Sequence, residues 1–225
     1  MVIRGSKTDR EIQKDVLSEL GWDTRVDETE IGVEVEKGVV TLTGTVDSYA
    51  KKIAARDAAH RVLGVLDVAD DIQVKLPGSL KRTDTEIAQA VRAALEWDAL
   101  VPDRKIRSTV SDGWVTLDGE VDTLREKEDA QHAVRALTGV KGVNNRLIVT
   151  AIKADPIRLR RFIEEALERR ADRQAEKIRV DIDDGTVRLA GQVRSWREKE
   201  AVLGAVSHAP GVREVQDRLT VNPWE

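Results

Sequence analysis

The sequence of 225 residues contains no cysteine, only 3 histidines and few aromatic residues, which make up 3% of the chain. Without cysteine there are no disulfide bonds, no thiolate ligands for zinc and no thiol nucleophile. The histidines, His60, His132 and His208, occupy three different positions of the repeat described below, so they indicate no shared chemistry. These absences predict a protein that is not an enzyme and that holds no metal or other cofactor.

Long apolar runs are also missing. No stretch reaches the roughly 18 consecutive apolar residues that a membrane-spanning helix needs, and the amino terminus lacks the apolar run of a signal sequence. We therefore expect a cytoplasmic protein without a transmembrane segment, and we expect any contact with a membrane to be peripheral.

One unit is present three times in the sequence. A set of glycines recurs at intervals of 75 and then 72 residues, and the apolar positions around them recur with it. We call this set the strand glycines: Gly44, Gly119 and Gly191. Fixed intervals of this kind are typical of tandem repeats. They predict three domains, at residues 8–74, 83–149 and 155–221, which align without a gap.

Charge is plentiful and nearly balanced, with 37 basic and 41 acidic side chains and a formal net charge of -4. Because binding to a nucleic-acid backbone depends on an excess of basic residues, this balance predicts no nucleic-acid partner. The balance changes along the chain, however. The first unit has a net charge of -7, the second of -3 and the third of +1.

Each unit begins with a helical pattern. In the first unit Ile12, Val16 and Leu20 recur at every fourth residue, behind the capping-box sequence TDRE. Alternating apolar residues then indicate two strands, joined at Lys37-Gly38 in the first unit and at Asp-Gly in the other two, which are dipeptides typical of a hairpin turn. An alanine-rich helix and a third strand complete the unit.

This order of elements predicts the fold class. We expect an α+β protein of three tandem αββαβ domains, each with a three-stranded mixed sheet, two helices on one face and water on the other. The strand glycines interrupt an inward-facing apolar row of the second strand. They predict either a place where a helix approaches closely or a bend in the strand.

The three units resemble BON domains, a family named for an osmotically induced periplasmic protein and nodulation proteins. The resemblance rests on the amphipathic first helix, the hairpin dipeptide and the segments GTVDSYAKK, GEVDTLREK and GQVRSWREK. It covers nearly the whole chain. It implies an α/β fold without known catalytic activity and attachment to phospholipid membranes, often under osmotic or envelope stress, and some relatives bind potassium ions.

Aromatic residues mark two candidate contact surfaces. The first lies at the start of the second helix of a unit, where Tyr49 precedes Lys52 and Trp196 precedes Lys199 by three residues. An aromatic ring beside a lysine is typical of residues that lie at lipid headgroups. The alternative is an apolar staple that packs the helix down, with the lysine in water. The second is Trp114, on the outward face of a strand, which predicts a contact surface or cover by a neighbouring unit.

Arginines are concentrated in the first helix of the third unit. Those at Arg158, Arg161, Arg169 and Arg173 are candidates for binding phosphate groups of anionic lipid or carboxylates of another protein. The alternative is a solvated helix held by pairs such as Glu165 with Arg169.

Three hypotheses for function follow. The first is stress-linked association with anionic phospholipid surfaces through the basic and aromatic residues. The second is a structural protein in which the acidic front of one copy meets the arginine-bearing rear of another, giving a head-to-tail homo-oligomer or filament. The third is an ion site at Asp70, Asn145 and Asp217, polar residues at an inward position of the third strand, which otherwise bond to a neighbouring turn.

Overall fold

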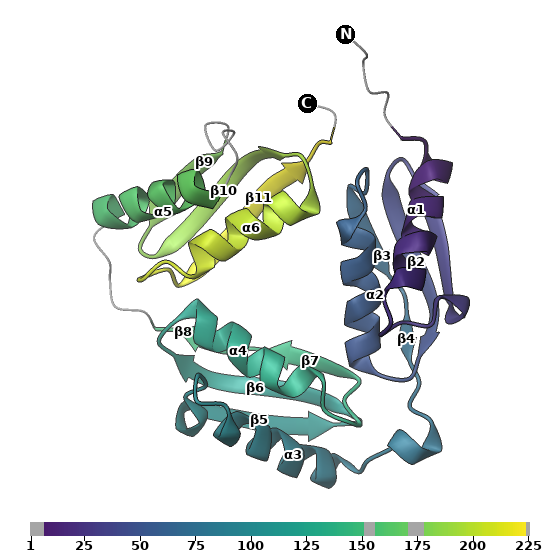
Figure 1. Ribbon diagram of the computed structural model, residues 1–225. Helices are drawn as coiled ribbons and strands as arrows, with labels where there is room; N and C mark the ends of the chain where they lie inside the picture. The colour runs from purple at the N-terminus through teal and green to yellow at the C-terminus, as the bar shows by residue number, and fades with distance from the viewer. Residues whose placement is uncertain (1–6, 151–155, 171–177, 224–225) are drawn as a thin grey trace. The chain divides into compact units, whose positions relative to one another are not determined.

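The computed structural model describes residues 7–150, 156–170 and 178–223, and for residues 166–170 only the backbone. It contains three domains of one topology, each with a helix, two strands, a second helix and a third strand (Figure 1). The prediction of an α+β chain of three tandem αββαβ domains is therefore confirmed.

The elements have closely matching lengths in the three domains. The first domain consists of α1 (Asp9–Trp22), β1 (Ile31–Glu36), β2 (Val39–Val46), α2 (Tyr49–Arg61), β3 (Asp67–Asp70) and β4 (Gln73–Val74). The second consists of α3 (Asp84–Trp97), β5 (Ile106–Ser111), β6 (Trp114–Val121), α4 (Leu124–Arg135), β7 (Gly142–Asn145) and β8 (Ile148–Val149). The third consists of α5 (Pro156–Arg170), β9 (Arg179–Asp183), β10 (Thr186–Val193), α6 (Trp196–Ser207) and β11 (Glu214–Val221).

Each sheet is mixed, as predicted. In the first domain β2 lies in the middle, antiparallel to β1 and parallel to β3 and β4. The second domain repeats this arrangement around β6, and in the third domain β10 lies between β9 and β11. Both helices of a domain lie on the same face of its sheet (Figure 1).

The core of each domain lies between the helices and the sheet. Ile12, Val16 and Leu20 of α1 are at most 2% exposed, so the predicted stripe is the buried one. The corresponding residues of the other first helices are also buried: Ile87, Val91, Leu95, Leu159 and Ile163. On α2 the stripe is made of alanines, which allow a helix to pack closely on a sheet.

The hairpin turns hold the first helix in place. Lys37 and Gly38 have φ angles of 51° and 78°, so both central residues of the turn lie in the left-handed region, as a type I′ turn requires. The Asp9 carboxylate accepts hydrogen bonds from both of their backbone N–H groups, at 2.8 and 2.9 Å. Asp84 does the same at the turn of the second domain.

The strand glycines have a backbone conformation that residues with a side chain rarely adopt. Gly44 has a φ of +119°, and a Cβ added there would lie 2.1 Å from the carbonyl oxygen of Glu30, just before β1. For Gly119 the φ is +138° and the corresponding distance, to Lys105, is 2.2 Å. Gly191 has a φ of +148°. The atoms that exclude a side chain from the first two positions belong to the last residues of two short 3-10 helices, Glu28–Glu30 and Asp103–Lys105, which lead into the neighbouring strands. A bend of the second strand at these glycines stays a prediction.

The third strand differs from the single strand that the pattern predicts. In the first domain it is interrupted between β3 and β4, where Asp70 Oδ1 accepts a hydrogen bond from the Ile72 N–H group at 3.3 Å. Asn145 Oδ1 accepts one from the Leu147 N–H group in the same way. A side-chain acceptor two residues back replaces a ladder bond, so the strand bulges. The third domain has one continuous strand, β11.

Candidate binding surfaces

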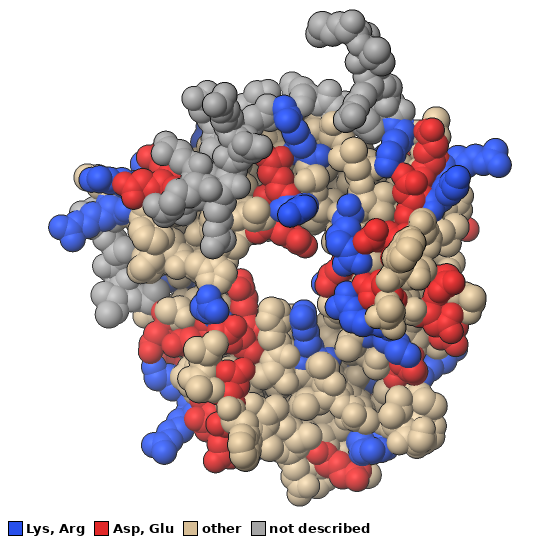
Figure 2. Space-filling view, viewed as in Figure 1, with Lys and Arg blue, Asp and Glu red and all other residues tan. Residues whose placement is uncertain are grey.

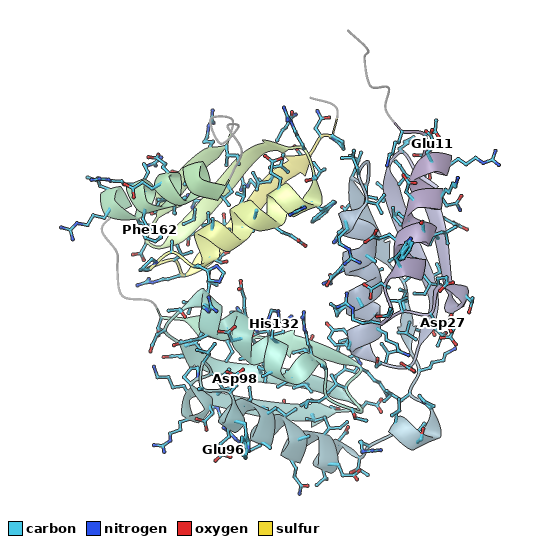
Figure 3. All side chains as sticks on the ribbon, viewed as in Figure 1. Glu11, Asp27, Glu96, Asp98, His132 and Phe162 are labelled. Atoms are coloured by element: carbon cyan, nitrogen blue, oxygen red, sulfur yellow. The ribbon has the colours of Figure 1, made fainter. Side chains whose placement is uncertain are left out.

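The exposed side of α5 combines arginines with apolar side chains. Leu159 and Ile163 face the core, whereas Ile157 is 79% and Phe162 42% exposed. Arg158 and Arg161 are also exposed. Since residues four apart are neighbours on a helix, Ile157 lies beside Arg161 and Arg158 beside Phe162. Figure 3 labels Phe162 on α5. Cationic and apolar groups therefore alternate on this surface, which we call the α5 face.

The two arginines of the α5 face are available to a ligand. Arg158 forms no ion pair with any described residue. Arg161 pairs with Glu165 at 2.9 Å, but its side chain is 82% exposed, and an exposed pair of this kind is weak. Arg160, by contrast, is bound to the fold, because it donates to the Val180 carbonyl oxygen at 2.7 Å. Figure 2 shows basic and acidic side chains together over α5.

Two of the arginines predicted for this helix cannot be placed. The side chain of Arg169 and all of Arg173 lie outside the described residues.

The lysines predicted beside the aromatic residues donate to the backbone of their own domain. Lys52 Nζ donates to the Ile72 carbonyl oxygen at 2.7 Å, and Lys199 Nζ donates to that of Leu219 at 2.9 Å. Lys127 makes the equivalent bond in the second domain, to Leu147, at 2.7 Å. Each lysine thus ties the second helix to the third strand of its domain. A lipid contact of Lys52 and Lys199 stays a prediction.

The aromatic residues of these pairs lie at the starts of their helices. Tyr49 is half-buried at the first turn of α2. Trp196 begins α6, and Lys199 Nζ lies 4.8 Å from the centroid of its ring, within the range of a cation–π contact. Their contact with lipid stays a prediction.

Trp114 lies across the neighbouring strand. It is 48% exposed and pairs with Gly142 of β7, where an added Cβ would lie 2.3 Å from the ring. The ring therefore covers the backbone of Gly142 in its own sheet, as aromatic residues do beside glycine in sheets. Half of the ring stays exposed, and its role in binding stays a prediction.

The polar residues considered as an ion site bond to the fold. Asp70 Oδ1 lies 3.5 Å from Lys52 Nζ, and the Asn145 side chain donates to Lys127 and Gln131. Asp217, the residue at the equivalent position of the third unit, lies in β11. Within the described ranges no cluster of three His, Cys, Asp or Glu residues could hold a metal ion, and no helix there is long and apolar enough to cross a membrane.

Several exposed apolar residues were missed in the sequence. Trp22 and Trp97, the last residues of α1 and α3, are 83% and 88% exposed, and Leu100 follows at 59%. Ile157 and Phe162 of the α5 face belong to the same class. A signal was present, because all but Leu100 fall within a predicted helix but off its apolar stripe.

Comparison with known proteins identifies relatives. A family model described as BON domain matches residues 8–75, 83–151 and 158–223. Osmotically-inducible protein Y of Escherichia coli (strain K12) is 37% identical over 123 residues, which cover 53% of this chain and 61% of that protein. The match thus spans about three fifths of the relative's length.

Solved structures give a weaker likeness. Two structures of CdsD, described as a structural protein of the Type III secretion system of Chlamydia trachomatis, are 14% and 13% identical to this chain. The alignments cover 93% and 96% of this chain and 91% and 100% of theirs, with a TM-score of 0.27 in both cases. A likeness at this score supports no conclusion about function.

Proposed function

This chain belongs to the BON domain family, and from that premise we propose that it is a non-enzymatic binding protein whose third domain associates peripherally with anionic phospholipid surfaces under stress. The observation that carries the proposal is the α5 face, where Arg158 and Arg161 alternate with Ile157 and Phe162. The link to stress is supported by the name of the relative, an osmotically inducible protein. The proposal includes the cytoplasmic location expected from the sequence.

The chemistry of the α5 face suits a headgroup layer. A guanidinium group can hold two phosphate oxygens at once, and each basic residue near an anionic surface contributes about 1 kcal/mol. Ile157 and Phe162 would leave water for the boundary of the acyl chains, which adds about 1 to 3 kcal/mol per side chain when burial is complete. The sum of a few such terms is a weak and reversible association. Tyr49, Trp196 and Trp114 are included as secondary contacts.

A flotation assay tests this proposal. The wild-type chain should float with vesicles that contain phosphatidylglycerol and stay in solution with phosphatidylcholine alone. The double variant Arg158→Glu/Arg161→Glu should lose most of this binding, and Ile157→Ser/Phe162→Ser should weaken it at unchanged charge.

The matched control is Arg104→Glu/Arg107→Glu, which changes the net charge equally at exposed arginines of the second domain. Its binding should equal that of the wild type within about twofold, because two distant surface charges contribute little once screened. Equal recovery of the wild type with neutral and anionic vesicles would contradict the proposal. So would an equal loss of binding in Arg158→Glu/Arg161→Glu and in the control Arg104→Glu/Arg107→Glu.

Head-to-tail self-association is the second candidate. It is favoured by the gradient of charge from -7 in the first unit to +1 in the third, and by a carboxylate of the second domain that pairs with no arginine of the described residues. This carboxylate, Asp98, is considered next.

A further inference from the structure

The first domain shows how the end of the first helix binds arginine. Asp23 follows α1, and its carboxylate takes the Arg25 guanidinium at 2.7 Å and that of Arg61, from the end of α2, at 3.0 Å. The Asp23 side chain is only 6% exposed. The hydrogen bond from Arg25, and then that from Arg61, holds the pKa of Asp23 far below its usual value.

The second domain has the same carboxylate without the arginines. Asp98 follows α3 as Asp23 follows α1, and its Oδ1 accepts from the Leu100 N–H group at 3.0 Å, the bond that Asp23 accepts from Arg25. At the two arginine positions, however, this domain has Leu100 and Ala136. Neither Asp98 nor Glu96, two residues before it, forms an ion pair with any residue that the structure describes.

Exposed apolar residues precede and follow this carboxylate in the chain. Trp97 is 88% exposed and Leu100, in the place of Arg25, is 59% exposed. Figure 3 labels Glu96 and Asp98 at the end of α3. Glu96, Trp97, Asp98 and Leu100 lie within five residues of one another at the end of this helix, and we call this segment the α3 end. An acidic group beside an exposed indole ring suits a guanidinium, which can pair with the carboxylate and stack on the ring.

We propose that the α3 end is a docking site for an arginine of a second copy of this chain, supplied by the α5 face. The proposal rests on the self-association named above as the second candidate. The two surfaces match in kind, since Arg158 and Arg161 complement Glu96 and Asp98 in charge, and Ile157 and Phe162 complement Trp97 and Leu100 in polarity. The arginine of the partner then takes the place that Arg25 and Arg61 occupy in the first domain.

The contact joins two different surfaces of the chain. Each copy then offers one donor and one acceptor, so copies add end to end unless the rotation between them closes a ring. A single contact between exposed charged residues is weak, and it weakens further as the salt concentration rises.

Sedimentation velocity over a range of protein concentration tests the proposal. The wild type should form oligomers that grow with concentration and dissociate in high salt. The variant Leu100→Arg/Ala136→Arg restores both arginines of the first domain beside Asp98, and should associate at least about tenfold more weakly because the site is then filled from within. The variant Glu96→Gln/Asp98→Asn should weaken association to the same extent. It keeps a side-chain oxygen at position 98 that can accept the hydrogen bond from the Leu100 N–H group.

A mixing experiment identifies the partner surface. Arg158→Glu/Arg161→Glu should also be monomeric. Mixed in equal amounts with Leu100→Arg/Ala136→Arg, it should give dimers and nothing larger, because one donor and one acceptor remain. The control Trp22→Ser removes the equivalent exposed indole of the first domain and should leave association unchanged, whereas Trp97→Ser should weaken it.

The outcomes distinguish self-association in general from docking at the α3 end. A wild type that stays monomeric at all concentrations would overturn both self-association and docking. Salt-sensitive oligomers that persist in Leu100→Arg/Ala136→Arg and in Glu96→Gln/Asp98→Asn would overturn docking at the α3 end and leave self-association standing. Neither variant should change flotation with phosphatidylglycerol vesicles, because the α5 face is intact in both, so the lipid proposal is judged independently.

Discussion

The hydrogen-bond and ion-pair partners of individual carboxylates determine the local structure at the hairpin turns and helix ends of this protein. Asp9 and Asp84 hold the hairpin turns, and the backbone N–H groups of Gly113 and then Asp112 lower the pKa of Asp84. Asp23 and Asp98 end equivalent helices but differ in whether an arginine is within reach. A residue-by-residue alignment of the three units would treat these last two as equal, and their surroundings make them different.

The substitution Asp23→Asn should lower the free energy of unfolding at neutral pH by about 1 to 2 kcal/mol, because it removes the charge-assisted hydrogen bonds that a buried carboxylate accepts from the exposed Arg25 and Arg61. The pKa of Asp23 is lowered in the folded state, so the unfolded chain takes up its proton more readily. The stabilisation is therefore complete above about pH 4, the usual aspartate range, and is lost as the pH falls below it.

Urea unfolding of both proteins from neutral to acid pH measures this difference. Asp98→Asn is the matched control, since its carboxylate has no arginine partner among the described residues, and it should change stability by less than about 0.5 kcal/mol. A difference between wild type and Asp23→Asn that grows on acidification would refute the assignment.

At the scale of the elements, the connection between the second helix and the third strand is the most consistent feature of the fold. Lys52, Lys127 and Lys199 each donate to a backbone carbonyl group that lies twenty residues further along the chain. In the first two domains this carbonyl group lies within the interruption of the third strand, directly before β4 or β8. The lysine therefore pairs with backbone at a place where the strand ladder is disturbed.

Replacing Lys127 by Met should lower the free energy of unfolding by about 1 to 2 kcal/mol, because the Leu147 carbonyl group loses a charged donor. Vesicle binding should not change. Arg125→Met is the control on the same helix, since Arg125 is 57% exposed and, among the described residues, pairs only with Asp129, at 3.5 Å. Chemical denaturation measures the stability of both variants, and flotation measures their vesicle binding. Reduced flotation of Lys127→Met at unchanged stability would show that Lys127 acts at the membrane instead.

At the scale of the whole molecule, three copies of one fold carry different surfaces. The buried positions are nearly the same in each domain because the core must be filled in the same way. The exposed positions have no such constraint, and the net charge of the units runs from -7 to -3 to +1. Three domains with one core can therefore present an acidic end, an exposed indole and an arginine-bearing helix along a single chain.

Limited trypsin digestion should separate the first domain early. The connection at residues 75–82 contains only a short turn, Gly78–Leu80, and both Lys81 and Arg82 are exposed. Exposed connections with few contacts are cleaved before packed elements. We expect a product that ends at Lys81 or Arg82, identified by mass spectrometry, and a delayed cut there in Lys81→Gln/Arg82→Gln. Early cuts inside residues 8–74 would speak against this boundary.

The elements and the core could be predicted from the sequence because they depend on local spacing. Apolar residues four apart, as in Ile12, Val16 and Leu20, select the buried side of a helix whatever packs on it. The left-handed turn at Lys37-Gly38 likewise follows from its two residues and the strands around it. The same spacing argument could have predicted that Ile157 and Phe162 are exposed, because both are apolar residues outside the buried stripe of their helix.

The partners of charged side chains were decided by tertiary structure alone. For Lys52 the sequence leaves open a lipid headgroup or water, and only the fold shows that its ammonium group donates to the Ile72 carbonyl group. Arg61 reaches Asp23 only because α1 and α2 pack side by side. That no arginine of the described residues pairs with Asp98 becomes visible only by comparison with that contact. A long, flexible side chain can pair with many groups, and the fold selects which of them comes close.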